Sequence, residues 1–325
     1  MLLAQISMRA ALRSFQLIGL TVAGGLFTPS QETPPARTPA ASVFRPIDQS
    51  DLDFYTNGRP YMELPLEELA HHIPELKDIQ PSKDQQSLLT ILEKTGMVVD
   101  QFFLDITNVI AHEDITQQIT RENNSRASMD LQYSYLIVLN RDEKPPRFEE
   151  YRMNKDGEAV TSRGTGQGFA VTSGFTLKCI HFSSAHRYES RFRHLGYGRL
   201  GQRNTYVVVF AQESPYAKIS ESVKGAWGTV PVYIQGIVWI DRETFQILRL
   251  RTDLLAPPAS LGLYRETTEI TFTETSLQDY KFPLWLPSSV NVEGVFDGQI
   301  FHNEHRYSDY KRYRVSVKMK APAAG

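Results

Sequence analysis

Two stretches of the sequence decide the fold, Tyr206–Phe210 (YVVVF) and Tyr233–Ile240 (YIQGIVWI). Side chains of a strand alternate between its two faces, and in both stretches each face carries apolar residues. An antiparallel strand often buries only one face, so these two need cover on both. We expect a curled sheet to supply one layer and a long helix the other. A sheet bent around a helix leaves an apolar concave space, which favours a ligand cavity. A core filled by the protein's own side chains is the alternative.

If the concave space is a cavity, side chains of these two strands should line it. The alternation leaves open which face of the second strand points inward. The choice lies between Tyr233, Ile237 and Trp239 on one face and Ile234, Val238 and Ile240 on the other. The candidate ligand-binding residues are Tyr206, Val208, Phe210, Tyr233, Ile237 and Trp239.

The rest of the chain from residue 113 also reads as strands, separated by turn signals such as Asp241-Arg242-Glu243 and Asp297-Gly298. Short links between consecutive strands favour antiparallel pairing. The predicted strands are 113–121, 131–139, 147–153, 187–195, 203–212, 231–240, 245–252, 264–274, 286–295, 299–307 and 312–319.

Helices are expected mainly before the strands. Residues 64–79 hold a short helical pattern that Pro74 interrupts. Ser82 and Gln85 have the spacing of a capping box, and an amphipathic pattern then runs to about Ile110. A short helix is expected near 169–183. The predicted fold class is therefore α+β: a strongly curved antiparallel sheet, or half-barrel, with helices covering its concave face.

The two ends of the chain are predicted to lie outside this fold. Arg9 and Arg13 precede an apolar run from Phe15 to Phe27 that suits a signal peptide, with cleavage after Ala23 or Ser30. Because no lipid-attachment Cys lies near this run, we expect a periplasmic or secreted protein with no transmembrane span in the mature form. The predicted organisation is a signal peptide at 1–27, a Pro-rich linker at 28–45, an N-terminal helical region packing on the sheet at 46–112, the curved sheet at 113–319 and a tail at 320–325.

Composition excludes several classes of protein. The chain has 325 residues, 35 Lys and Arg against 37 Asp and Glu, and a hydrophobic fraction of 41%, which is typical of a folded chain. A single Cys excludes a disulfide framework. The balance of charge, together with export, argues against a nucleic-acid partner.

Few residues suggest chemistry, and we predict no catalytic residue, no metal site and no cofactor. The spacing of Gly164, Gly166 and Gly168 does not match a phosphate-binding loop. Cys179 lies in an apolar context typical of an inert buried thiol. His302 and His305 are three residues apart in a predicted strand, so they should point to opposite faces and not share a metal ion.

One region resembles a known family. The relevant segments are Gly196–Phe210 (GYGRLGQRNTYVVVF), Gly236–Asp241 (GIVWID), Thr244, Ile247–Leu250 (ILRL), Leu286-Pro287 and Tyr307–Tyr310 (YSDY). Their order is similar to that in periplasmic half-barrel proteins of the LolA/LolB-like, outer-membrane lipoprotein-sorting type. The resemblance covers roughly residues 185–319. The resemblance implies a curved antiparallel sheet closed by helices. The best-known members of this family hold the lipid chains of lipoproteins in an apolar cavity. The resemblance assigns no functional residue individually.

Three functions are consistent with these observations. The first is an exported, non-enzymatic binding protein that carries or senses a lipid or a lipoprotein acyl chain in its concavity. The second is a structural or envelope-sensing protein with a filled core, which acts through an envelope protein partner. The third is a hydrolase whose site the sequence does not reveal.

Overall fold

The structure is a computed structural model, and it describes residues 5–6, 59–106, 109–121, 123–140, 147–160, 175–213, 216–218, 221–225, 228–257, 262–278, 280–296 and 298–312. The predicted signal peptide, linker and tail therefore lie outside the described residues, apart from residues 5–6. The glycines 164–168 and almost all of the predicted strand 312–319 also lie outside them.

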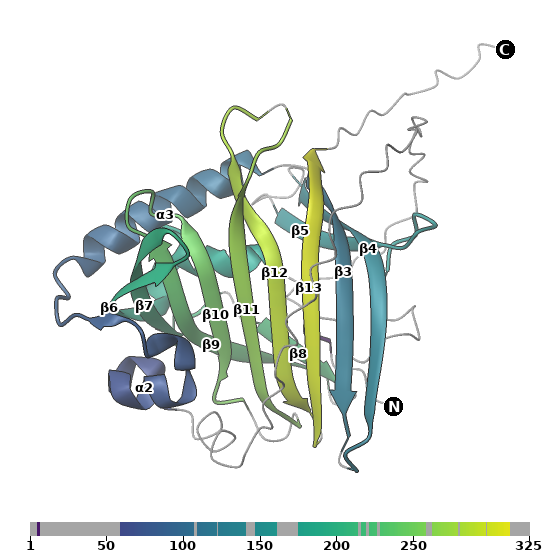
Figure 1. Ribbon diagram of the computed structural model, residues 1–325, viewed down its shortest axis with the longest axis horizontal. Helices are drawn as coiled ribbons and strands as arrows, with labels where there is room; N and C mark the ends of the chain where they lie inside the picture. Colours follow the sequence, from purple (N-terminus) through teal and green to yellow (C-terminus); the bar gives the residue numbers. More distant parts are fainter. Residues whose placement is uncertain are drawn as a thin grey trace.

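One antiparallel sheet dominates the molecule (Figure 1). Its strands follow the order β2-β6-β7-β9-β10-β11-β12-β13-β3-β4-β5, and β8 pairs with β9 and β1 off this path. The strands are β1 (Gln5–Ile6), β2 (Gln80–Pro81), β3 (Val109–Thr120), β4 (Arg126–Asn140), β5 (Arg147–Met153), β6 (Ser190–Leu200), β7 (Arg203–Gln212), β8 (Glu221–Gly225), β9 (Gly228–Asp241), β10 (Ile247–Leu255), β11 (Leu263–Thr275), β12 (Leu284–Phe296) and β13 (Gln299–Arg312).

The helices are few and mostly short. The α-helices are α2 (Leu66–His72) and α3 (Leu88–Asp105), and the 3₁₀ helices are η1 (Tyr61–Glu63), η2 (Pro74–Leu76), η3 (Thr176–Phe182) and η4 (Arg187–Glu189). In Figure 1, α3 crosses the upper left of the sheet and α2 lies at the lower left.

The seven-residue helix η3 shows that the sheet is strongly curved. Thr176, at its start, contacts Tyr135 of β4, and Phe182, at its end, contacts Phe210 of β7. A 3₁₀ helix of this length spans about 14 Å. In a flat sheet, β4 and β7 would be more than about 30 Å apart, because neighbouring strands are about 4.8 Å apart. The sheet therefore curls around η3, and the predicted fold class is confirmed.

The two faces of the central strands have different covers. On the concave face, Val208, Phe210 and Val238 share a core with Ile91 and Val99 of α3. The opposite face belongs to a second core, in which Leu69, Ile73 and Leu76 pack on Val207, Val209, Ile237 and Trp239. The layer that we expected from the curled sheet is thus supplied by residues 61–79.

Helix α3 begins later and ends earlier than its pattern predicts. The capping box does not form, because the Gln85 amide pairs with β6: it donates to the carbonyl of His194 at 2.8 Å and accepts from the His194 N–H at 3.0 Å. The helix starts after Ser87. It stops at Asp105, since Val109 and Ile110 pair with Ile137 and Leu136 of β4.

The turn after β9 depends on Asp241, whose side chain is 3% exposed. Its Oδ1 accepts from the N–H groups of Glu243 at 2.9 Å and Thr244 at 2.8 Å, and its Oδ2 accepts from Arg203 at 3.0 Å. Burial raises the pKa of Asp241, but the hydrogen bonds outweigh burial and lower it.

We expect Asp241→Ala to lower the free energy of unfolding by about 1–3 kcal/mol, since the N–H groups of Glu243 and Thr244 and the Arg203 guanidinium lose their acceptor. Urea denaturation measures the change. Asp241→Asn is the matched control, because its carbonyl oxygen still accepts both turn hydrogen bonds; it should cost less. Equal losses for both variants would show that the turn bonds are not the main contribution.

Candidate binding site

The concave face is occupied by α3 and η3. The Thr176 hydroxyl lies 3.2 Å from the Tyr135 hydroxyl, and the Thr176 N–H donates to the Glu150 carboxylate at 3.1 Å. At the other end of η3, the Phe182 ring packs edge-on against Phe210 with centroids 5.2 Å apart. The protein's own chain therefore fills the middle of the concavity.

Helix α3 lies on η3 at close range. A Cβ atom on Gly96 would be 3.1 Å from the carbonyl oxygen of Phe182, so a residue with a side chain would force the two elements apart. Next to this contact, the Ser184 N–H donates to the Asp100 carboxylate at 3.2 Å. At the end of the helix, the Tyr280 hydroxyl donates to the Asp105 carbonyl at 2.9 Å. These contacts hold α3 over the sheet.

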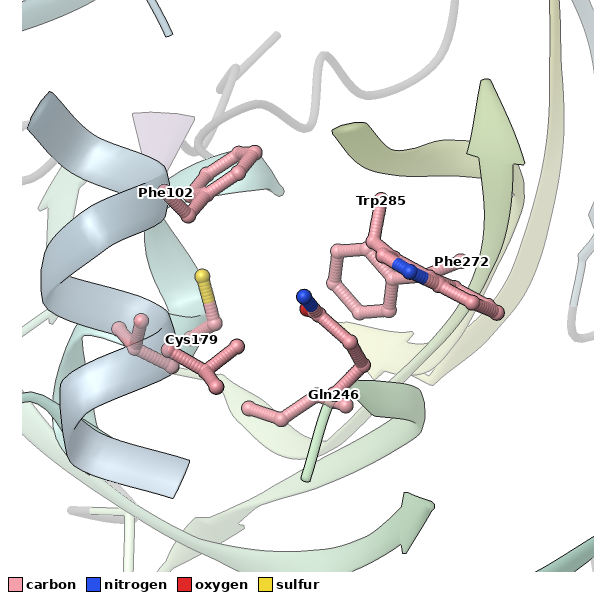
Figure 2. A pocket seen from close by; sticks show the side chains of 8 residues that line it. Phe102, Cys179, Gln246, Phe272 and Trp285 are labelled. Atoms are coloured by element: carbon pink, nitrogen blue, oxygen red, sulfur yellow. The ribbon is translucent and has the colours of Figure 1, made fainter. Parts of the chain in front are cut away.

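A small cavity remains between α3, η3 and the strand ends. It is lined by Val98, Val99, Phe102, Cys179, Gln246, Ile247, Phe272 and Trp285. In Figure 2, Phe102 and Cys179 lie on one side and Phe272 and Trp285 on the other, with Gln246 between them. Its volume of about 20 Å³ is close to the smallest that holds one water molecule. The lining is almost wholly apolar, so the space suits part of an apolar chain.

The register divides the six candidate residues between the two faces. Val208 pairs with Val238, whereas Val209 pairs with Ile237 and Val207 with Trp239. Val208 and Phe210 belong to the concave core, and Tyr206 packs against its edge. Ile237 and Trp239 lie in the second core, beneath residues 61–79. Tyr233 shares their face of β9 by alternation. None of the six lines the cavity in Figure 2.

Sequence reasoning missed a buried charged cluster on the concave face. Glu113, fully buried, accepts from Arg152 at 2.5 and 2.7 Å, from the Tyr307 hydroxyl at 2.8 Å, and lies 3.0 Å from Nδ1 of His305. Burial alone raises the pKa of Glu113, but Arg152 and the hydrogen bonds hold it at about 2. The sequence did hold one signal of this cluster. Glu113 falls on the same side of the alternating strand β3 as the buried residues Ala111 and Ile115.

The described residues offer little for catalysis or metal binding. Burial raises the pKa of the Cys179 thiol to about 12, so the reactive thiolate is scarce near neutral pH. His302 faces Glu293 at 3.4 Å, on the side of the sheet opposite His305, as the spacing predicted. No cluster of three metal-ligating residues occurs within the described part of the chain. Nor do its helices include one long and apolar enough to span a bilayer.

Comparison with solved structures finds several matches of low sequence identity. A putative outer membrane lipoprotein-sorting protein domain from Vibrio parahaemolyticus is 13% identical, with a TM-score of 0.32, over 70% of this chain and 95% of that one. A LolA superfamily protein from Nitrosomonas europaea matches at 11% identity and a TM-score of 0.28, over 70% of this chain and 94% of that one.

A third similar structure is a DUF1329 family protein from Desulfovibrio piger ATCC 29098. It is 10% identical, with a TM-score of 0.34, over 71% of this chain and 94% of that one. The first two structures are of the lipoprotein-sorting and LolA kind to which the segments within residues 185–319 are similar. No protein-family description matches the chain, and no curated protein does.

Proposed function

We propose that this protein is an exported, non-enzymatic binding protein that takes up one apolar chain, such as a lipid or lipoprotein acyl chain, between α3 and the curved sheet. The apolar cavity beneath α3 carries the proposal, because it already separates the helix from Phe272 and Trp285. Export to the periplasm or the medium is proposed from the pattern of residues 1–27.

Uptake of an acyl chain requires α3 to move outward, because the cavity is far smaller than such a chain. Each methylene that leaves water contributes about 0.8 kcal/mol. Ten methylenes thus contribute roughly 8 kcal/mol to binding. The separation of α3 from its apolar contacts opposes this contribution. Outward movement would break the Asp100–Ser184 and Asp105–Tyr280 hydrogen bonds, whose net worth is about 1 kcal/mol each. Neither hydrogen bond belongs to a strand ladder, so α3 would move without unfolding of the sheet.

The opened space would extend from the cavity toward the central strands. Val208, Phe210 and Tyr206 lie on that side, together with Val238 and Ile240. Phe245 connects the two regions, since its ring stacks on Tyr206 with centroids 6.1 Å apart and the Lys94 ammonium of α3 lies 4.7 Å from its centroid. We propose these concave-face residues as the ligand contacts, and we assign Tyr233, Ile237 and Trp239 to the opposite layer.

A second candidate function is favoured by η3. Because η3 occupies the centre of the concavity and contacts both β4 and β7, the core of the closed form is largely filled. A sensing protein that acts through an envelope protein partner would need no further space.

Val98→Phe separates the two candidates. A phenyl ring at this cavity-lining position occupies the space beneath α3, so we expect at least a tenfold loss of affinity for a fluorescent fatty acid, with the fold retained. Met97→Phe is the matched control, because Met97 is 69% exposed on the outer side of the same helix; its affinity should equal that of the unmodified protein.

Equal affinity in both variants would overturn the position of the site. A purified protein that carries no lipid by mass spectrometry and takes up no fatty acid would overturn binding itself. Crosslinking to an envelope protein would then support the sensing function.

A further inference from the structure

The cavity beneath α3 has a buried floor and a half-exposed mouth. Its eight lining residues divide into a buried group, Val99, Cys179, Ile247 and Phe272, and a half-buried group, Val98, Phe102, Gln246 and Trp285. The half-buried group lies where α3 faces the turn between β9 and β10, with Gln246 between the two walls (Figure 2). We propose that this is the entrance to the cavity and that Phe245, in the turn, is its gate.

The Phe245 side chain spans the entrance from the turn to α3. Gln246, the next residue, lines the cavity, and Lys94 lies one helical turn before Val98, which lines it from α3. The Lys94 ammonium is 4.7 Å from the centroid of the Phe245 ring, and the ring stacks on Tyr206 with centroids 6.1 Å apart. Because Lys94 is exposed and Phe245 is half-buried, the ring lies between the cavity and solvent.

The backbone of Phe245 is in a conformation that bulky residues rarely adopt. Its φ is 59°, in the left-handed region that glycine enters readily. The turn requires this conformation, since the Phe245 N–H donates to the Asp241 carbonyl at 3.0 Å and the Asp241 N–H donates to the Gln246 carbonyl at 2.9 Å. Glycine would satisfy the same turn with less strain. The turn therefore does not account for the phenyl ring, whereas its contacts with Lys94 and Tyr206 do.

Strain of this kind collects at binding sites and moving segments. When Phe245 leaves the left-handed region, the strain is relieved and the ring separates from Lys94. Relief of strain thus offsets part of the lost ring contacts, and the gate opens at a lower cost than an unstrained residue would require.

The other side of the entrance is held more firmly. The Arg203 guanidinium lies 4.8 Å from the centroid of the Trp285 ring, and it donates to Asp241 at 3.0 Å and to Glu274 at 3.1 Å. Hydrogen bonds between charged groups are stronger than those between neutral ones. The Trp285 side therefore has two charge-assisted bonds, whereas the Phe245 ring is held by ring contacts, so the entrance opens at Phe245.

This gate would control the site of the proposed function. The proposal rests on that function only for what enters, namely an apolar chain. Opening itself needs no ligand, so it can be measured on the protein alone and can fail independently of acyl-chain uptake.

Alkylation of Cys179 tests the gate. Cys179 is the single cysteine of the chain, is 4% exposed and lines the cavity floor, so its modification by N-ethylmaleimide, followed by mass spectrometry, reports opening. Phe245→Gly keeps a backbone that the turn favours but lacks the ring, and we expect alkylation at pH 8 to be at least tenfold faster. Phe245→Tyr keeps the ring and is the matched control; it should react at the rate of the unmodified protein.

Lys94→Ala releases the ring without a change in the turn, so it tests the gate even if Phe245→Gly does not fold. We expect at least threefold faster alkylation. Glu93→Ala is its control, because Glu93 is an exposed neighbour on the same helix, and its rate should not change. Local opening exposes little surface, so 1 M urea should leave these ratios unchanged.

Equal rates for Phe245→Gly and the unmodified protein would overturn the gate. So would an acceleration that rises steeply with urea, because unfolding of the whole protein would then expose the thiol. Faster alkylation of Phe245→Gly in a protein that takes up no fatty acid would support the entrance and overturn the proposed function.

Discussion

Glu113→Gln is expected to lower the free energy of unfolding by about 3–5 kcal/mol. The carboxylate is the partner of Arg152, which is 6% exposed, and it also accepts from Tyr307 and contacts His305. Its removal leaves a buried guanidinium without its counter-charge, and losing one member of a buried ion pair has this cost. Thermal or urea unfolding, read by circular dichroism, measures the change.

Two further variants separate the charge from the packing. Glu68→Gln is the exposed control, because its pair with Arg59 is open to solvent on both sides and should contribute less than about 1 kcal/mol. In Glu113→Gln/Arg152→Met neither buried charge remains, so stability should recover in part. A double variant as unstable as the sum of the two single variants would contradict charge pairing as the cause.

The same cluster should make the protein sensitive to acid. The pKa of Glu113 falls from an ordinary 4.5 to about 2 in the folded state, so its stabilisation is present above about pH 4.5 and is lost as the pH falls toward 2. The difference corresponds to about 3 kcal/mol. Burial also lowers the pKa of His305, whose protonation therefore opposes folding below its ordinary value of 6.5. In the Glu113→Gln variant, the loss of stability between pH 4.5 and pH 2 that Glu113 causes should be absent.

The strand pattern was readable from the sequence because it depends on neighbouring residues. The alternation of side chains predicted β5 and β7 with their observed bounds, and the doubly apolar stretches indicated cover on both faces. The helix at 88–105 followed from its apolar stripe. In each case the signal is local, since a strand or helix repeats within a few residues.

The charged cluster was not readable, because its members are distant in sequence. Glu113, Arg152 and His305 come from three strands, and only the order β13-β3-β4-β5 brings them together. The pairing of Gln85 with His194 was hidden for the same reason. The sequence also left open which face of β9 points inward. Ile237 and Val238 lie on opposite faces and are equally apolar. Only the packing of residues 61–79 on Ile237 shows which face points outward.

Gly236→Ala is expected to destabilise the protein by more than about 3 kcal/mol. Gly236 lies in the doubly apolar stretch of β9, opposite Phe210 of β7 and Thr252 of β10. A Cβ atom there would be 2.0 Å from the carbonyl oxygen of Arg251 and 2.9 Å from the Phe210 ring. The first neighbour is backbone in the centre of the sheet, and the ring is fully buried against Phe182. Neither can move without disturbing the ladder or the contact between β7 and η3, and overpacking of this kind costs 1–3 kcal/mol or more.

The expected loss corresponds to a fall of about 6–12 °C in the unfolding temperature, since 1 kcal/mol shifts a domain of this size by about 2–4 °C. Gly157→Asn is the control. Gly157 has a φ of 78° with no atom within 4 Å of an added Cβ, and Asn tolerates that backbone conformation, so its unfolding temperature should change little. If Gly236→Ala unfolded at the temperature of the unmodified protein, Phe210 would not be packed on β9 as the structure places it. The curvature inferred from η3 would then lose its anchor on β7, because Phe182 contacts that same ring.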